Sequence, residues 1–145
     1  MSNDQTAAMA EAGRILAETA VDNARKVAPV LCAAAEQIEA ERALTPEVLT
    51  AMHEGQLFRL SLPRRHGGAE LPLPQLAQVA AIISAADAST AWCLGQSFGC
   101  AMSAAYMDEE PARQVFDPGN AVLAWGFGPQ GRAVATKGGY LDLAG

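Results

Sequence analysis

The sequence predicts a mainly α-helical protein that ends in the first strands of an incomplete β-domain. Three observations lead to this fold class. Residues 1–118 contain segments in which apolar residues recur every three or four positions, the spacing of an amphipathic helix. Within them, residues 88–107 carry no charge at all. After Asn120 the pattern changes to an apolar run, an alternating segment and a glycine turn, which together are typical of strands.

Composition limits the size and the partners of the protein. A chain of 145 residues, 50% of them hydrophobic, can form one domain with a core but has little room for two. The net charge of -6 argues against nucleic acid or an anionic membrane as the main partner. With only His53 and His66 available, a metal site is not expected.

Cysteine usage and the first residues predict a cytoplasmic protein. Cys32, Cys93 and Cys100 are odd in number and lack a C-x-x-C spacing, which fits a reducing compartment. The chain begins MSNDQT, without the basic start and apolar run of a signal peptide.

The N-terminal region predicts helix in two pieces. Residues 6–44 are rich in Ala, Glu and Arg, and Pro29 is expected to divide them and to occupy the first turn of the second piece. The first piece is expected to be a loosely held extension. The predicted units are therefore an N-terminal helical extension (1–20), an α-helical domain (21–118) and the truncated start of a central β-domain (119–145).

A short helix is predicted next, because Thr45 supplies a capping hydroxyl and Pro46 suits the first helical position. The residues predicted to face the core are Val48, Leu49 and Met52. Gly55 is expected to end the helix as a C-cap glycine. Beyond it, Pro63 and the glycine pair at 67–68 predict an irregular turn whose basic residues, 64–66, are interpreted as solvated rather than as an anion site.

Two further helices are predicted, from Pro74 to Ala86 and then from a cap at Asp87. The second has no charged face, so we expect it at the centre of a helical bundle. A membrane span is rejected because the stretch contains too many polar groups for lipid.

Two faces of this uncharged helix are candidates for function. One carries Trp92, Gln96, Gly99 or Cys100, and Ser103, and the buried indole and amide groups expected there need partners. The other is a stripe of small residues that includes Gly95 and Gly99. Glycine destabilises a helix interior, so something is expected to pack closely on the stripe, either another helix, which we favour, or a flat ligand.

The C-terminal region predicts a helix over 112–116, a buried strand over 121–125 and a hairpin formed by residues 132–143. Residues 126–131 spell G-x-G-x-x-G, but a dinucleotide fingerprint requires a helix after the loop, and a strand is predicted there. The glycines still allow close approach of a flat cofactor. Three short strands do not form a stable sheet alone, so the chain looks like the front part of something longer.

This ordered set of motifs resembles the N-terminal portion of the acyl-CoA dehydrogenase superfamily. The segments that carry the resemblance are 43–47 (ALTPE), 55–60 (GQLFRL), 62–63 (LP), 66–68 (HGG), 87–92 (DASTAW), 129–133 (PQGRA) and 138–140 (GGY). The resemblance implies an N-terminal helical bundle, a central β-domain, a second bundle afterwards, a flavin held between them and, usually, a homotetramer. His66 replaces the aromatic residue often found before the two glycines.

Residues 87–92 are similar to the branch that includes flavin-dependent two-component monooxygenases. That branch uses reduced flavin, FMNH2 or FADH2, supplied by a reductase, and its tryptophan borders the substrate. The resemblance thus implies substrate contacts at Trp92, Gln96 and Cys100, although family members commonly have a histidine where this chain has Cys100. In the dehydrogenases the segment matching 123–128 lies against the flavin, which implies cofactor contacts at Trp125, Gly126 and Gly128.

The leading functional hypothesis is the N-terminal part of an FAD-dependent oxidoreductase that acts on CH–CH groups of a small molecule. The alternatives are a flavin-dependent monooxygenase of the same fold and a catalytically incompetent, truncated fragment. We assign no catalytic residue, because no acid in this chain is a credible base: Asp87 is interpreted as a helix cap and residues 108–110 as a solvated turn. In the family that base lies in the later bundle.

Overall fold

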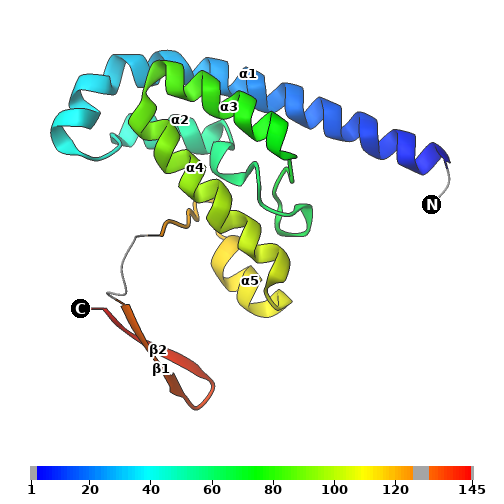
Figure 1. Cartoon of the computed structure of the whole chain (residues 1–145), viewed down its shortest axis with the longest axis vertical. Coiled ribbons are helices and arrows are strands. Elements are labelled where there is room, and N and C mark those ends of the chain that lie inside the picture. The colour runs from blue at the N-terminus through cyan, green and yellow to red at the C-terminus, as the bar shows by residue number, and fades with distance from the viewer. Residues whose placement is uncertain (1–2, 126–130, 145) are drawn as a thin grey trace.

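The computed structural model describes residues 3–125 and 131–144, and the side chains of residues 16–125 and 132–139. The elements within these ranges are α1 (Asn3–Glu41), α2 (Pro46–Glu54), η1 (Leu57–Arg59), η2 (Arg64–His66), α3 (Leu73–Ala86), α4 (Ala88–Met102), η3 (Ser103–Tyr106), α5 (Glu109–Phe116), β1 (Gly131–Thr136) and β2 (Gly139–Ala144). The prediction of a mainly helical chain that leads into strands is confirmed (Figure 1). The domain boundaries at residues 20 and 118 stay predictions.

α1 is one continuous helix, so the predicted break at Pro29 is wrong. Ala24, Val27 and Leu31 are all buried on the same side of the helix, before and after the proline. A proline in a helix interior costs about 3 kcal/mol, and burial of this apolar stripe along α3 offsets that cost. Pro29 itself faces solvent. Ala17 packs against the core and Ala20 is buried, so the helix is held well before the proline.

α2 begins as predicted, but two of the three residues predicted to face the core do so. The Thr45 hydroxyl accepts a hydrogen bond of 3.3 Å from the Val48 N–H and caps the helix. Val48 and Met52 are fully buried, whereas Leu49 is 38% exposed, so its predicted inward position is wrong. A nine-residue helix that packs through one side buries positions four apart, and Leu49 lies about 100° away from Val48 on the helix.

Gly55 is the C-cap residue of α2, as predicted, but it does not adopt the left-handed conformation. Its φ is -70°, and the left-handed conformation belongs to Gln56, whose φ is 56°. A Cβ at Gly55 would lie 3.2 Å from the Ala51 carbonyl oxygen and 3.3 Å from Cγ2 of Val27. The glycine therefore permits a close approach to α1 instead of supplying a left-handed C-cap.

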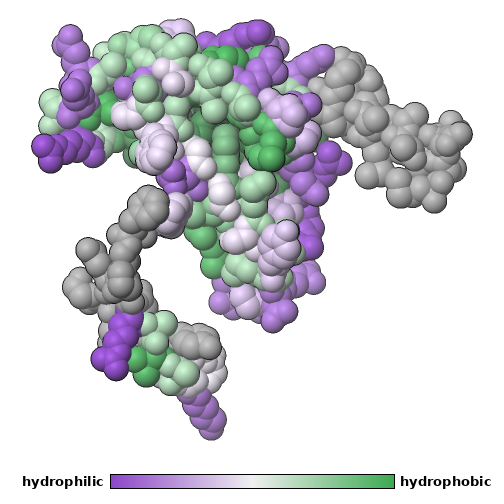
Figure 2. Space-filling view, in the orientation of Figure 1, coloured by the Kyte–Doolittle hydropathy of each residue, from purple (hydrophilic) through white to green (hydrophobic). Residues whose placement is uncertain are grey.

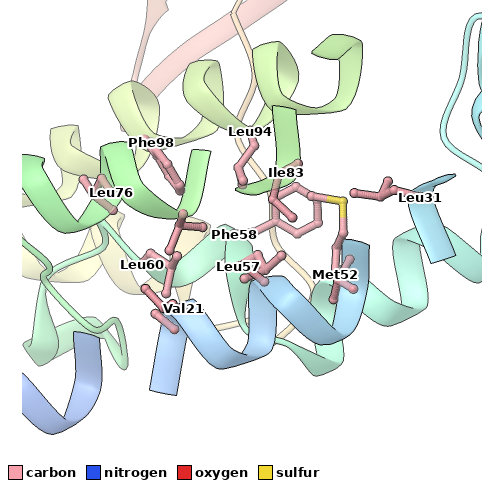
Figure 3. Close-up of a cluster of buried hydrophobic side chains, with 14 of the residues drawn as sticks. Val21, Leu31, Met52, Leu57, Phe58, Leu60, Leu76, Ile83, Leu94 and Phe98 are labelled. Carbon is pink, nitrogen blue, oxygen red and sulfur yellow. The ribbon is translucent and has the colours of Figure 1, made fainter. Parts of the chain in front are cut away.

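The main core lies between α1, α2, α3, α4 and η1. Figure 3 shows side chains from all five elements meeting there, and the residues it labels are Val21, Leu31, Met52, Leu57, Phe58, Leu60, Leu76, Ile83, Leu94 and Phe98. A second, smaller cluster joins the end of α4 to α5. Its buried members are Leu62, Ala101, Ala104, Ala112 and Phe116.

A tightly folded segment, residues 57–71, connects these two clusters. Its two arms are joined by backbone hydrogen bonds from the Ala69 N–H to the Arg59 carbonyl (3.0 Å) and from the Leu71 N–H to the Leu60 carbonyl (2.8 Å). A Cβ at Gly68 would lie only 1.9 Å from the Leu62 carbonyl oxygen. A residue with a side chain does not fit at position 68 unless the arms separate.

The interpretation of residues 64–66 as a solvated turn is wrong for His66, whereas Arg64 and Arg65 are exposed as expected. His66 is only 4% exposed. Nη2 of Arg65 donates to the carbonyl oxygens of Ala104 (2.9 Å) and Ala105 (3.1 Å), and Nη1 of Arg59 donates to that of Phe116 (3.0 Å). Carbonyls at the ends of helices lack partners within the helix, and these guanidinium groups satisfy them.

α4 does not lie at the centre of the bundle, so that prediction is wrong. It packs on α3 and η1 through one side and runs from the end of α3 toward α5 (Figure 1). The buried residues on this side are Thr90, Leu94, Ser97, Phe98 and Ala101. The opposite side faces solvent because the described elements pack against α4 from one direction only.

The C-terminal elements confirm the hairpin but not the strand predicted before it. α5 begins at Glu109, three residues earlier than predicted, with Pro111 in its first turn. Residues 121–125 form no strand, since the described chain offers them no neighbouring strand. β1 and β2 pair antiparallel around a turn at Lys137 and Gly138, and Gly138 has a φ of 94°. The hairpin lies apart from the helices (Figure 1).

Candidate functional site

The candidate site is the solvent-facing side of α4, which we call the α4 face and define by Trp92, Gly95, Gln96, Gly99 and Ser103. Trp92 is 67% exposed, and both glycines and Ser103 are also exposed, while Gln96 is half-buried. Cys100 is half-buried at the margin of this face. The structure thus brings together the three residues for which substrate contacts were predicted, Trp92, Gln96 and Cys100, but without the burial that the sequence implied.

The stripe of small residues borders an open groove. A Cβ added at Gly95 or Gly99 would meet no heavy atom within 4 Å. The groove, of about 430 Å³, is lined by Leu73, Ala77 and Ala80 from α3 and by Gly95, Gly99 and Met102 from α4. All six residues are uncharged, and Figure 2 shows pale to green surface along α3 and α4. The sequence predicts that either another helix or a flat ligand packs on the stripe. No helix of the described chain packs closely on Gly95 and Gly99.

Sequence reasoning missed the α3 side of this groove. Ala77 and Ala80 are small residues three positions apart, so they lie on neighbouring parts of one helix surface. Their counterparts across the groove are Gly95 and Gly99. Each of two consecutive helices therefore carries a pair of small residues, and the sequence shows both pairs. The two helices are joined at Asp87 and pack against each other.

Asp87 caps α4 as predicted. Its Oδ1 accepts hydrogen bonds from the Thr90 N–H (2.6 Å) and the Ser89 hydroxyl (2.7 Å). Burial raises the pKa of this carboxyl, but the hydrogen bonds from Thr90 and Ser89 outweigh that effect and hold the pKa below its usual value. An ionised carboxylate bound to a helix N-terminus is a stabilising group, which supports the interpretation of Asp87 as a cap.

The residues predicted to contact the cofactor are only partly described. Trp125 follows α5 and is 52% exposed. Gly126 and Gly128 lie outside the described residues, as does most of the G-x-G-x-x-G loop. β1 and not a helix comes after that loop, as predicted. The cofactor contacts at these three positions therefore stay a prediction.

The described residues contain no group of three or more His, Cys, Asp and Glu side chains placed to hold a metal ion. Among the helices within the described ranges, none combines the length and the apolar character that a bilayer span requires.

Comparisons with known proteins agree with the resemblance seen in the sequence. Residues 6–118 match the family described as acyl-CoA dehydrogenase, N-terminal domain. The pigment production hydroxylase of a Rhodococcus species is 28% identical over 121 residues, which cover 83% of this chain and 31% of that protein. XiaF from a Streptomyces species, solved in complex with FADH2 and glycerol, superposes with a TM-score of 0.79 at 30% identity, covering 91% of this chain and 33% of its own.

This chain therefore spans about a third of the length of both relatives. The match over residues 6–118 includes every helix from α2 to α5, the candidate α4 face and the 57–71 segment. The chain belongs to the acyl-CoA dehydrogenase N-terminal domain family.

Proposed function

We propose that this chain forms one helical wall of the active site of a flavin-dependent oxidoreductase. The observation that carries the proposal is the α4 face, which is uncharged and exposed and contains one indole and two glycines. An exposed apolar surface beside a groove is the ordinary form of a small-molecule site. In this proposal the molecule that covers the α4 face is the flavin, the substrate or both.

The α4 face suits a flat, mostly apolar molecule with a few polar groups. Open space above Gly95 and Gly99 lets a ring system approach the helix closely. Trp92 supplies an aromatic surface for stacking, and the Gln96 amide supplies both donors and acceptors. A bound flavin supplies the redox chemistry, while this chain binds, orients and excludes water. The FAD contacts predicted at Trp125, Gly126 and Gly128 remain part of the proposal.

Between the two reaction types, we favour hydroxylation with reduced flavin. One relative is named a hydroxylase, and the other was solved with FADH2. The sequence alone had favoured a dehydrogenase acting on CH–CH groups, and that reaction is the second candidate. Under the favoured proposal, the substrate is a small, uncharged molecule contacted by Trp92, Gln96 and Cys100, and a separate reductase supplies the reduced flavin. A homotetramer is the assembly expected from the resemblance.

Binding measurements test the proposal without assuming a substrate. The purified chain is titrated with FAD, FMN and, without oxygen, FADH2, and thermal stability and tryptophan fluorescence are monitored. We expect FADH2 or FAD to raise Tm, and we expect Trp92→Phe to weaken binding without lowering Tm. Absence of binding by all three flavins, in this chain and in a longer chain extended past Gly145, would reject the flavin-enzyme proposal in favour of a non-catalytic helical domain.

The coding DNA beyond Gly145 separates the two reaction types. A glutamate placed as the base in a later helical bundle would support the dehydrogenase, because that reaction removes a proton from carbon. A histidine and serine pair would support the hydroxylase. A stop codon directly after Gly145 would favour the catalytically incompetent fragment.

A further inference from the structure

The Arg65 side chain binds η3, the short helix that follows α4. Its Nη2 donates to the carbonyl oxygens of Ala104 and Ala105 in η3, at 2.9 and 3.1 Å. Its Nε donates to Nε2 of the buried His66, at 3.1 Å. These carbonyls lie just past the C-terminus of α4, where a positive charge is also favoured by the helix dipole. The guanidinium thus fixes the turn in which α4 tightens into a 3-10 helix.

Ser61 makes a second bond from the same segment to α4. Its hydroxyl donates to the Phe98 carbonyl at 2.9 Å, and both residues are buried. Between these two attachments, Leu62 packs against Ala101 and Ala104 in the smaller core cluster. The 57–71 segment therefore holds the C-terminal part of α4 and the η3 helix after it by two polar attachments and one apolar contact.

The C-terminal part of α4 and the start of η3 carry the distal part of the candidate site. Cys100 and Ser103 lie there, and the Ser103 hydroxyl donates to the Cys100 carbonyl at 2.6 Å. Trp92 and Gln96 lie nearer the N-terminus of α4, on the turns before the Ser61 contact. A helix end frays readily when its last carbonyls have no partners. Loss of the Arg65 bonds would then move the distal part of the site relative to Trp92.

We propose that Arg65 is a positioning residue that holds Cys100 and Ser103 in line with Trp92 and Gln96. The proposal rests on the proposed function of the α4 face as a binding wall. Arg65 acts through the backbone of η3 and touches no ligand in this scheme. The sequence favours a solvated turn over an anion site at residues 64–66, and Nε and Nη2 of Arg65 donate to His66 and to carbonyl oxygens.

The test compares Arg65→Gln and Arg65→Lys with Arg64→Gln as the matched control. Arg64 is exposed, as Arg65 is. The backbone N–H of Arg64 donates to Oε2 of Glu70, but within the described residues its guanidinium group makes no hydrogen bond. Amide hydrogen exchange is measured residue by residue by NMR. We expect Arg65→Gln to speed exchange at residues 101–106 about tenfold, since hydrogen bonds to a charged group are stronger than neutral ones. Exchange in α1 should not change.

The second measurement is binding of indole and FAD, which serve as the flat probes, by the same four proteins. We expect Arg65→Gln to weaken binding at least about threefold, Arg65→Lys to recover part of both effects, and Arg64→Gln to behave as wild type. Unchanged exchange at 101–106, a uniform rise that includes α1, or faster local exchange with unchanged affinity would each overturn the positioning role. If wild type binds neither probe, both in this chain and in a longer chain extended past Gly145, the proposed function fails and this inference fails with it.

Discussion

Replacing Gly99 by alanine is expected to stabilise the helical fold while weakening ligand binding. Glycine in a helix interior is less favourable than alanine by about 0.8 to 1.0 kcal/mol. The added Cβ would meet no heavy atom within 4 Å, so no steric term opposes this gain. The free energy of unfolding should therefore rise by about 1 kcal/mol, which corresponds to an increase in Tm of about 2 to 8 °C.

Urea denaturation monitored by far-UV circular dichroism measures the stability change, and a titration with indole or FAD measures binding. The new methyl group projects toward the groove, so affinity should fall by about threefold to tenfold, the scale of a modest packing conflict. A lower free energy of unfolding would contradict the open position of Gly99, because it would mean that another part of the protein covers this residue. Unchanged affinity would show that the probe does not approach the glycine stripe.

Three further predictions concern residues whose surroundings differ from one another. Trp92→Ala should change the free energy of unfolding by less than about 1 kcal/mol, because the side chain is 67% exposed, whereas a buried tryptophan would cost about 3 to 5 kcal/mol; urea denaturation decides. Gly68→Ala should destabilise the protein by more than about 4 kcal/mol or abolish folding, because its Cβ would lie 1.9 Å from the Leu62 carbonyl oxygen. Asp87→Asn should lose stability at neutral pH but not in acid: the folded-state pKa lies below the unfolded value, so this contribution is present above the unfolded pKa and is lost as pH falls through the folded one.

Each of these predictions has its own contradicting result. A large loss of stability in Trp92→Ala would place the indole in a core. A well-folded Gly68→Ala variant would mean that the two arms of the 57–71 segment separate more easily than their hydrogen bonds suggest. For Asp87, a stability difference between wild type and Asp87→Asn that stays constant from neutral pH to strong acid would remove the carboxylate from the capping role.

The sequence predicted the elements that depend on local chemistry. Thr45 and Asp87 are caps because a short polar side chain before a helix binds its first free N–H groups, and this rule needs no tertiary information. The hairpin around Gly138 was predictable from alternation and a glycine turn for the same reason. Pro29 shows the limit of such rules, since burial of residues on both sides of it overrides the local preference.

The features that the sequence did not predict depend on contacts between distant segments. The charge-free composition of α4 indicated a helix shielded on all sides, but composition does not reveal which covering elements are present in a given chain. The role of Arg65 depends on a carbonyl 39 residues away, and basic residues beside a turn give no sign of such a partner. Gly68 was recognised only as a turn residue, because its need for close approach is set by the opposite arm.

Chemical-shift mapping can establish whether the exposed side of α4 binds a flat small molecule. The ¹⁵N-labelled chain is titrated with FADH2 and with indole while every backbone amide and both indole N–H groups are observed. We expect the shifts to concentrate at the Trp92 indole, the Gln96 amide and the backbones of Gly95 and Gly99. Shifts confined to other surfaces, or no saturable shifts with either molecule, would contradict it.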